Sequence, residues 1–165
     1  MISSQVRKYA LGILAQQKDF LSKVDAHVYA QSCPTLSSSI GQHIRHAVDH
    51  FRALLGDGNS NERRVVDYDS RDRGTAVESD PAIALRVVTE CEESIQSLPV
   101  NDFDVEVEFM MNSDGERGSF QSSMSRELAF VAHHAIHHHA MIKAIGHLPG
   151  NGVWPMSDNE SACRT

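Results

Sequence analysis

Cysteines are few in this sequence, and it has no long apolar run. The three cysteines, Cys33, Cys91 and Cys163, are odd in number and far apart, and none belongs to a CxxC pair. This argues against a disulfide framework and predicts a reducing, cytoplasmic compartment. No apolar stretch approaches the ~20 residues that cross a bilayer, and the opening segment MISSQVRKYA has no hydrophobic signal region. We therefore expect neither export nor a membrane partner.

Positive charge is also scarce. The formal net charge of -7 disfavours a nucleic-acid partner, which needs an extended basic face. The most basic stretch, residues 63–73, alternates arginines with aspartates and predicts a solvated loop. The sequence also has no G-x-S-x-G elbow and no glycine-rich phosphate loop, and none of its cysteines lies near the two histidine-rich elements, residues 43–50 and 133–139. These absences argue against serine and cysteine hydrolases and against nucleotide-binding enzymes.

Apolar residues recur at helical spacing in four segments of the 165-residue chain. They predict helices over residues 4–27, 39–55, 81–96 and 125–145. Asp80 and Pro81 form a start signal for the third helix, and the GDG at 56–58 ends the second. A chain of this length fits one domain with its own core. We assign that domain to residues 1–154 and expect a disordered tail over 155–165.

Two long connections separate these helices. Residues 56–79 are polar and aperiodic, so we expect a loop there. Within residues 100–124, DVEVEFMM alternates like a strand, and NSDGERG could turn the chain into a hairpin with SFQSS. The predicted fold is all-α: a four-helix bundle with long crossover connections and a short β-hairpin between the third and fourth helices.

The most unusual segment is HHAIHHHA, residues 133–140. It is framed by LAFVA and MIKAI, which are apolar and unlike the linkers beside an expression tag. On a helical wheel, His134 and His138 fall within the apolar arc one turn apart. An i, i+4 pair of this kind is the geometry of a helical two-histidine metal clamp. His133, His139 and His147 are predicted to be surface residues.

A third ligand could come from the second helix, where SIGQHIRHAVDHFRALL contains His43, His46 and His50. The wheel places His43 and His50 nearer the apolar stripe than His46. Three imidazoles around one divalent ion would leave coordination positions open. The alternative from the residues alone is a set of hydrogen-bonded core histidines without a metal.

Three stretches of the sequence resemble the DinB-like family of metal-binding four-helix bundles. They are SIGQHIRHAVDHFRAL, YDSRDRGTAVESDPAIAL and ELAFVAHHAIHHHAMI. The resemblance implies one divalent metal ion, nickel or zinc first and iron next, held by one histidine of the second helix and two of the fourth. Carried over by position, these ligands are His46, His134 and His138, with His50 and His43 as the alternatives on the second helix. Asp49 is expected to be a solvated residue; the less favoured alternative is that it orients the imidazole of a ligand histidine.

Two functions remain open after this resemblance. Characterised relatives include thiol S-transferases and isomerases that use bacillithiol, mycothiol or glutathione, which implies a metal-dependent thiol transferase acting on small electrophiles. Arg71 and Arg73 would then be candidates for holding a carboxylate. The alternative is a non-catalytic metal-binding or dimerisation module linked to stress or metal handling, and the resemblance makes a homodimer plausible. A diiron site is disfavoured because Glu127 lies seven residues before His134, outside the Glu-x-x-His spacing.

Overall fold

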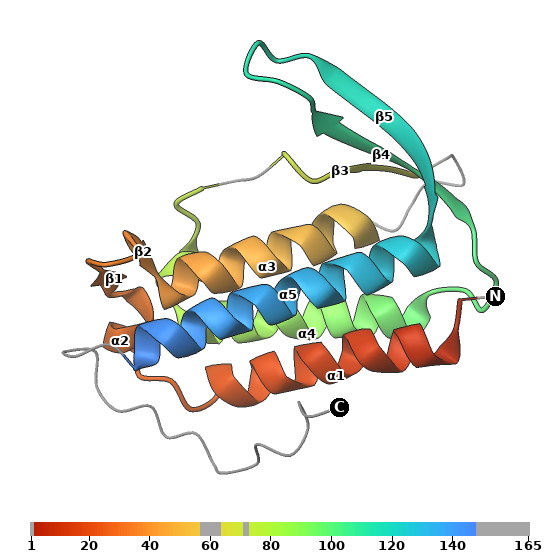
Figure 1. Ribbon diagram of the computed structural model, residues 1–165. Coiled ribbons are helices and arrows are strands. Elements are labelled where there is room, and N and C mark those ends of the chain that lie inside the picture. Colours follow the sequence, from red (N-terminus) through yellow and green to blue (C-terminus); the bar gives the residue numbers. More distant parts are fainter. Residues whose placement is uncertain (1, 57–63, 71–72, 148–165) are drawn as a thin grey trace.

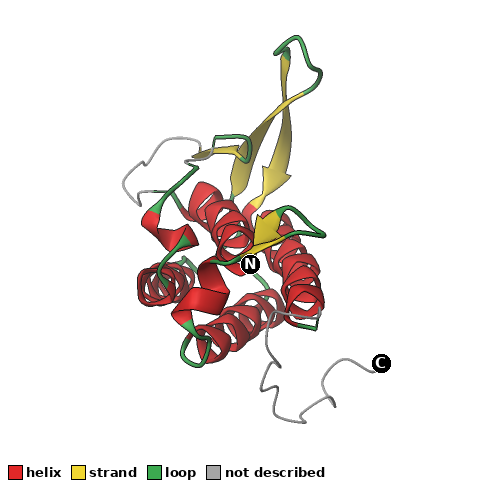
Figure 2. Cartoon of the chain, turned by 90° about the vertical axis from the view of Figure 1, so that its left-hand side faces the viewer, coloured by secondary structure: helices red, strands yellow, loops and turns green. Residues whose placement is uncertain are grey.

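Four long helices form a bundle in the computed structural model, which describes residues 2–56, 64–70 and 73–147. They are α1 (Ser4–Leu21), α3 (Ile40–Leu55), α4 (Pro81–Ser97) and α5 (Met124–Gly146). Helices α1 and α3 each pack against both α4 and α5 (Figures 1 and 2). Each helix therefore contacts two neighbours around a shared core, as the sequence predicts. The all-α description needs amendment, because two small sheets accompany the helices.

The first predicted helix is divided into two. Helix α1 ends at Leu21, and a second, short helix, α2 (Ala26–Ala30), follows it. The Asp25 side chain accepts hydrogen bonds from the backbone N–H groups of His27 and Val28 and so begins α2. The prediction of one continuous helix over 4–27 was wrong after Leu21, because the N-cap at Asp25 starts a new helix.

The other three long helices begin and end within two residues of their predicted bounds. Ser39 caps α3 in a capping box with Gln42, and Asp80 caps α4 beside Pro81. Ser123 accepts from the Arg126 N–H at the start of α5. Local side-chain caps thus set the starts of α3 and α5, the two helices that contain the candidate ligands His46, His134 and His138.

The predicted hairpin is present and belongs to a three-stranded sheet. Strand β4 (Asp104–Met110) pairs antiparallel with β5 (Arg117–Ser123), and Val107 lies opposite Phe120. Strand β3 (Arg64–Asp67) adds to the other edge of β4 in parallel, within the segment predicted to be a loop. Figure 1 shows the hairpin projecting from the bundle. A second sheet pairs β1 (Ser32–Cys33) with β2 (Ser38–Ser39).

A contact between α3 and the segment before α4 closes the end of the bundle near the second sheet. The short 3-10 helix η1 (Ala76–Glu78) lies against α3, and a Cβ atom added to Gly41 would collide with the carbonyl oxygen of Glu78. The Arg45 guanidinium pairs with the Glu78 carboxylate at 2.7 Å, and Tyr29 donates to the Val77 carbonyl at 2.6 Å. Glycine at position 41 therefore permits the close approach of η1.

Each long helix contributes fully buried side chains to one core, Leu14, Phe51, Ile95 and Leu128 among them. In the ranges that the structure describes, no helix combines the length and apolar character needed to cross a membrane. The predicted domain end at residue 154 and the predicted tail over 155–165 lie outside the described residues.

Candidate metal centre

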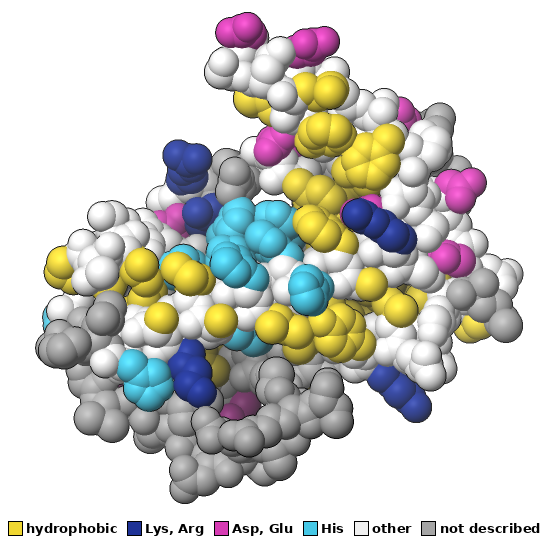
Figure 3. All heavy atoms as spheres, viewed as in Figure 1, with side chains coloured by type: hydrophobic (Ala, Val, Ile, Leu, Met, Phe, Trp, Pro, Cys, Tyr) yellow, Lys and Arg dark blue, Asp and Glu magenta, His cyan; other side chains and the backbone are white. Residues whose placement is uncertain are grey.

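Helices α3 and α5 bring His46, His134 and His138 together; we call these three residues the histidine trio. His138 is buried, at 7% exposure, whereas His46 and His134 are half-buried. Figure 3 shows histidine side chains gathered in the middle of one face of the molecule, with apolar side chains beside them on the side toward the hairpin. The histidine cluster is therefore partly buried in the bundle and partly accessible at its surface.

One ring nitrogen from each member of the trio lies within 4.8 Å of the others. The Nε2 atoms of His134 and His138 are 3.0 Å apart, and the His46 ring centroid lies 5.1 Å from that of His134 and 4.7 Å from that of His138. Two imidazole nitrogens bound to one tetrahedral zinc ion lie roughly 3.4 Å apart. The trio could therefore hold one metal ion after small side-chain movements.

The protonation state of His138 suits a ligand. Burial, followed by the nearby imidazoles of His134 and His46, lowers the pKa of His138 to about 3. Its ring is therefore neutral at neutral pH, and a neutral imidazole offers one nitrogen lone pair to a metal.

His50, one alternative ligand on α3, supports the trio by packing. Its Nδ1 atom donates to the His46 carbonyl oxygen at 2.9 Å. Its ring stacks on that of His134, with centroids 4.1 Å apart, and on that of Tyr68, with centroids 5.2 Å apart. His50 is 8% exposed, as its place near the apolar stripe predicts.

His43, the other alternative, contacts a different edge of the cluster. Its Nδ1 atom lies 3.0 Å from Nδ1 of His138, and its Nε2 atom lies 2.9 Å from the Ser38 hydroxyl. Burial, and then the neighbouring His137, lowers the pKa of His43. His43 therefore meets His138 on the nitrogen that does not face His134.

Tyr68 and Phe130 border the cluster with aromatic surface. Their ring centroids are 5.4 Å apart, and that of Phe130 is 6.0 Å from the ring centroid of His134. Phe130 is one of the apolar residues of α5 and is nevertheless 37% exposed. It stays accessible because it lies at the edge of the α5 face that meets α3.

A buried carboxylate anchors Tyr68. The Tyr68 hydroxyl donates to Glu127 Oε2 at 2.8 Å, while Glu127 Oε1 accepts from Ser122 at 2.5 Å and from Arg126 at 2.6 Å. Glu127 is fully buried. The sequence predicts no role for Tyr68, although it lies in the YDSRDRG motif, and Glu127 is considered there only as a diiron ligand, which its spacing disfavours.

The remaining predicted site residues have mixed outcomes. Arg71 lies outside the described residues, and Arg73 is exposed. Asp49 is not simply solvated, because it pairs with Arg45 at 2.8 Å and its side chain is 15% exposed. Asp49 therefore stabilises the buried Arg45 side chain on α3 through this ion pair.

The surface prediction holds for His133 and His147, which are exposed, and was wrong for His139. Burial lowers the pKa of His139 to about 4. Its Nε2 atom is also buried and has no hydrogen-bond partner in the described part of the chain. The wheel misplaced this residue because it treats α5 as covered on one side only, whereas α5 packs against both α1 and α3.

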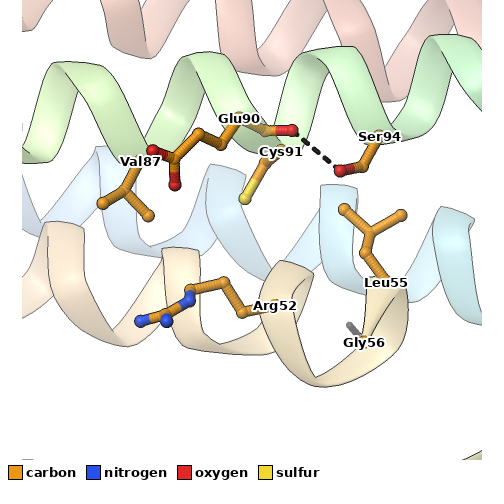
Figure 4. A pocket seen from close by; sticks show the side chains of 7 residues that line it. All are labelled: Arg52, Leu55, Gly56, Val87, Glu90, Cys91 and Ser94. Carbon is orange, nitrogen blue, oxygen red and sulfur yellow. Dashed lines mark hydrogen bonds between the residues drawn. The ribbon is translucent and has the colours of Figure 1, made fainter. Parts of the chain in front are cut away.

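A hollow of about 170 Å³ lies between α3 and α4, away from the histidine trio, and no histidine lines it. Arg52, Leu55, Gly56, Val87, Glu90, Cys91 and Ser94 line it (Figure 4). The Ser94 hydroxyl donates to the Glu90 carbonyl oxygen at 2.9 Å. Burial raises the pKa of the Cys91 thiol to about 12, so this thiol is protonated and a poor nucleophile at neutral pH.

Comparison with known proteins gives one family and one distant relative. A family model described as the DinB superfamily matches residues 15–142. FK506-binding protein 5 of Rhizopus delemar (strain RA 99-880) is 36% identical over 84 residues, which are 49% of this chain and 22% of that protein. The chain thus spans less than a quarter of that relative. No solved structure matches the chain. The matched family region contains the whole histidine trio and most of the bundle, and the chain belongs to the DinB superfamily, as the sequence motifs predict.

Proposed function

We propose that the protein binds one divalent metal ion through His46, His134 and His138 and leaves coordination positions open for a ligand. The observation that carries this proposal is the convergence of one nitrogen from each ring to within 4.8 Å. The low pKa of His138 supports it, because protons compete with metals for imidazole nitrogen. Imidazole donors suit nickel and zinc, with iron as a further candidate.

The reaction that we propose is transfer of a low-molecular-weight thiol to a small electrophile. An ion held by the three imidazoles would supply Lewis acidity, which would favour the thiolate form of a thiol at neutral pH. The thiol proton passes to solvent, the sulfur forms a bond to the electrophilic carbon, and the leaving group departs with its electron pair. Bacillithiol, mycothiol and glutathione are the candidate thiols.

The residues around the trio have separate parts in this proposal. Phe130, with 37% of its surface exposed, offers apolar contact to the electrophile. Tyr68 excludes water from one side of His50, on whose ring it stacks. Arg73 is exposed and could pair with a carboxylate of the thiol.

A metal-binding module without turnover is the second candidate function. The observation that favours it concerns Glu127, the buried carboxylate joined to Tyr68. Its oxygens already accept from Tyr68, Ser122 and Arg126, so it is poorly placed to act as a general base. Both proposals include a homodimer. Light scattering during size-exclusion chromatography would measure the molar mass of the protein and so test this.

The test begins with metal binding by the untagged protein. After treatment with a chelator, the protein is dialysed against zinc or nickel, and bound metal is measured by elemental analysis. We expect about one ion per chain in the wild type, as for a three-histidine site, and loss of most of it in His138→Ala. The control is His147→Ala, which removes an exposed histidine and should bind like the wild type.

Turnover is then assayed with 1-chloro-2,4-dinitrobenzene and each of the three thiols. Product formation that needs both metal and His138 would support the transferase. Metal binding without product from any pair would favour the binding module. A wild-type protein that retains no metal would overturn both candidates.

A further inference from the structure

A chain of three polar side chains runs behind the histidine trio. Ser38 is in β2, His43 is in the first turn of α3, and His138 is in α5. The Ser38 hydroxyl lies 2.9 Å from His43 Nε2, and His43 Nδ1 lies 3.0 Å from His138 Nδ1. These two contacts connect β2 and α3 to one candidate ligand on α5.

The chain fits one arrangement of protons. A neutral imidazole has one N–H group and one lone pair. The Nε2 atom of His138 faces Nε2 of His134 at 3.0 Å, so an ion between them needs the lone pair of His138 on Nε2. The proton of His138 is then on Nδ1 and is donated to His43 Nδ1. His43 must therefore have its proton on Nε2, from which it donates to the Ser38 oxygen.

The contact between His43 and His138 is a hydrogen bond between ring edges. Their centroids are 5.3 Å apart and their planes are tilted by 41°, while the two nitrogens are only 3.0 Å apart. His50 differs, because its ring stacks on His134 at 4.1 Å with planes 24° apart. Of the two histidines beside the trio on α3, His43 thus contacts a trio ring through a ring nitrogen, whereas His50 stacks on one.

We propose that His43 is a positioning residue that fixes the tautomer and the orientation of His138, and that Ser38 fixes His43 in turn. This inference rests on the proposed metal site. His43 is not a ligand in this arrangement, because it occupies the nitrogen of His138 on the side away from His134. Removal of the residue that hydrogen-bonds the second nitrogen of a metal-binding histidine typically weakens metal binding by about 10–100-fold.

The test compares three substitutions of His43 with a control on α5. His43→Ala and His43→Phe remove the acceptor, whereas His43→Gln keeps an oxygen that can accept from His138. The control is His137→Ala, which removes an exposed ring that meets His138 edge to face, with centroids 5.2 Å apart. Zinc affinity is measured by competition with a chromogenic chelator, and the urea midpoint of each metal-free variant is measured alongside.

We expect His43→Ala and His43→Phe to bind zinc about 10–100-fold more weakly than the wild type. His43→Gln should recover much of the loss, and His137→Ala should match the wild type. A urea midpoint unchanged by His43→Phe would show that the loss is not one of folding. Nitrogen NMR of the zinc-bound wild type should find the His138 proton on Nδ1 and the His43 proton on Nε2, whether or not any variant folds.

The outcomes separate this inference from the proposed function. Wild-type protein that binds no zinc would overturn both. Wild-type protein that binds zinc with an affinity unchanged in His43→Ala and His43→Phe would overturn the role of His43 alone. NMR evidence that a His43 nitrogen is itself bound to zinc would also overturn it, because His43 would then be a ligand.

Discussion

The ring of His50 lies face to face with that of His134, with centroids 4.1 Å apart and planes 24° apart. The same ring also stacks on that of Tyr68, with planes 17° apart. His134 of the trio thus stacks on His50, and His50 stacks on Tyr68, the residue that follows β3. The stack connects the bundle to the segment that precedes α4.

This stack predicts that His50 can be replaced by another aromatic residue. We expect His50→Phe to bind about one ion per chain, because the three proposed ligands of the site remain. His46→Ala should lose the metal. Elemental analysis of both variants after dialysis makes the comparison. Loss of metal in His50→Phe with retention in His46→Ala would show that His50 is the α3 ligand.

Removal of the Tyr68 hydroxyl should destabilise the protein. In Tyr68→Phe the ring can still stack on His50, but Glu127 loses one of its hydrogen bonds inside the core. A hydrogen bond to a charged group contributes about 1.5–3 kcal/mol, and we expect a loss of that size in the free energy of unfolding in urea. Tyr9→Phe, at a more exposed position (38%), is the control. Equal stability of the two variants would contradict the prediction.

Arg7 should be important for the end of α4. Its guanidinium donates to four backbone carbonyls, those of Ile95, Gln96, Leu98 and Pro99, at 3.0–3.1 Å. Lysine keeps the charge but has no planar fork. We expect Arg7→Lys to lose about 1–3 kcal/mol of unfolding free energy in urea, while Lys8→Ala, at an exposed neighbour, changes it by less than about 0.5 kcal/mol. If both variants match the wild type, the four bonds contribute nothing measurable.

The Cys91 thiol should resist alkylation in the folded protein at both pH 7 and pH 9. Burial raises its pKa from 9.0 to about 12, so the folded state keeps the proton that the unfolded state loses above pH 9. Stability from this group is therefore fully present below pH 9 and declines as the pH rises toward 12.

Iodoacetamide labelling followed by mass spectrometry of the Cys91 peptide tests this expectation. In urea the same cysteine should react, and faster at pH 9 than at pH 7. Labelling of the folded protein at the rate seen in urea would mean that the hollow between α3 and α4 leaves the thiol accessible.

Features set by neighbouring residues along the chain could be predicted from the sequence. The caps at Ser39 and Asp80 act within three residues, and the i, i+4 spacing of His134 and His138 places both rings on one face of α5. The hairpin was also predicted, because its alternation extends over most of β4.

Features set by contacts between distant segments could not be predicted in this way. Strand β3 has one fully buried residue, Val66, which is too little alternation to indicate a strand, and it forms because β4 pairs with it. The burial of Glu127 depends on Tyr68, 59 positions away. A wheel drawn for one helix has no information about such partners, so its placement of His43 and His50 nearer the apolar stripe than His46 does not say which of the three faces the histidines of α5.

The trio joins α3 to α5 across about 90 residues of intervening chain, so an ion bound there would act as a cross-link that closes a long loop. Neither half of the polypeptide contains the full set of donors, and during synthesis the last of them leaves the ribosome only with α5. Metal capture would therefore come late in folding. Since the unfolded chain lacks the preformed site, bound metal would add RT ln(1 + [M]/Kd) to the free energy of unfolding, where [M] is the concentration of free metal. Under metal starvation, the folded fraction would therefore be lower than in metal-replete cells, and the lifetime of the protein in the cell would fall with the supply of metal.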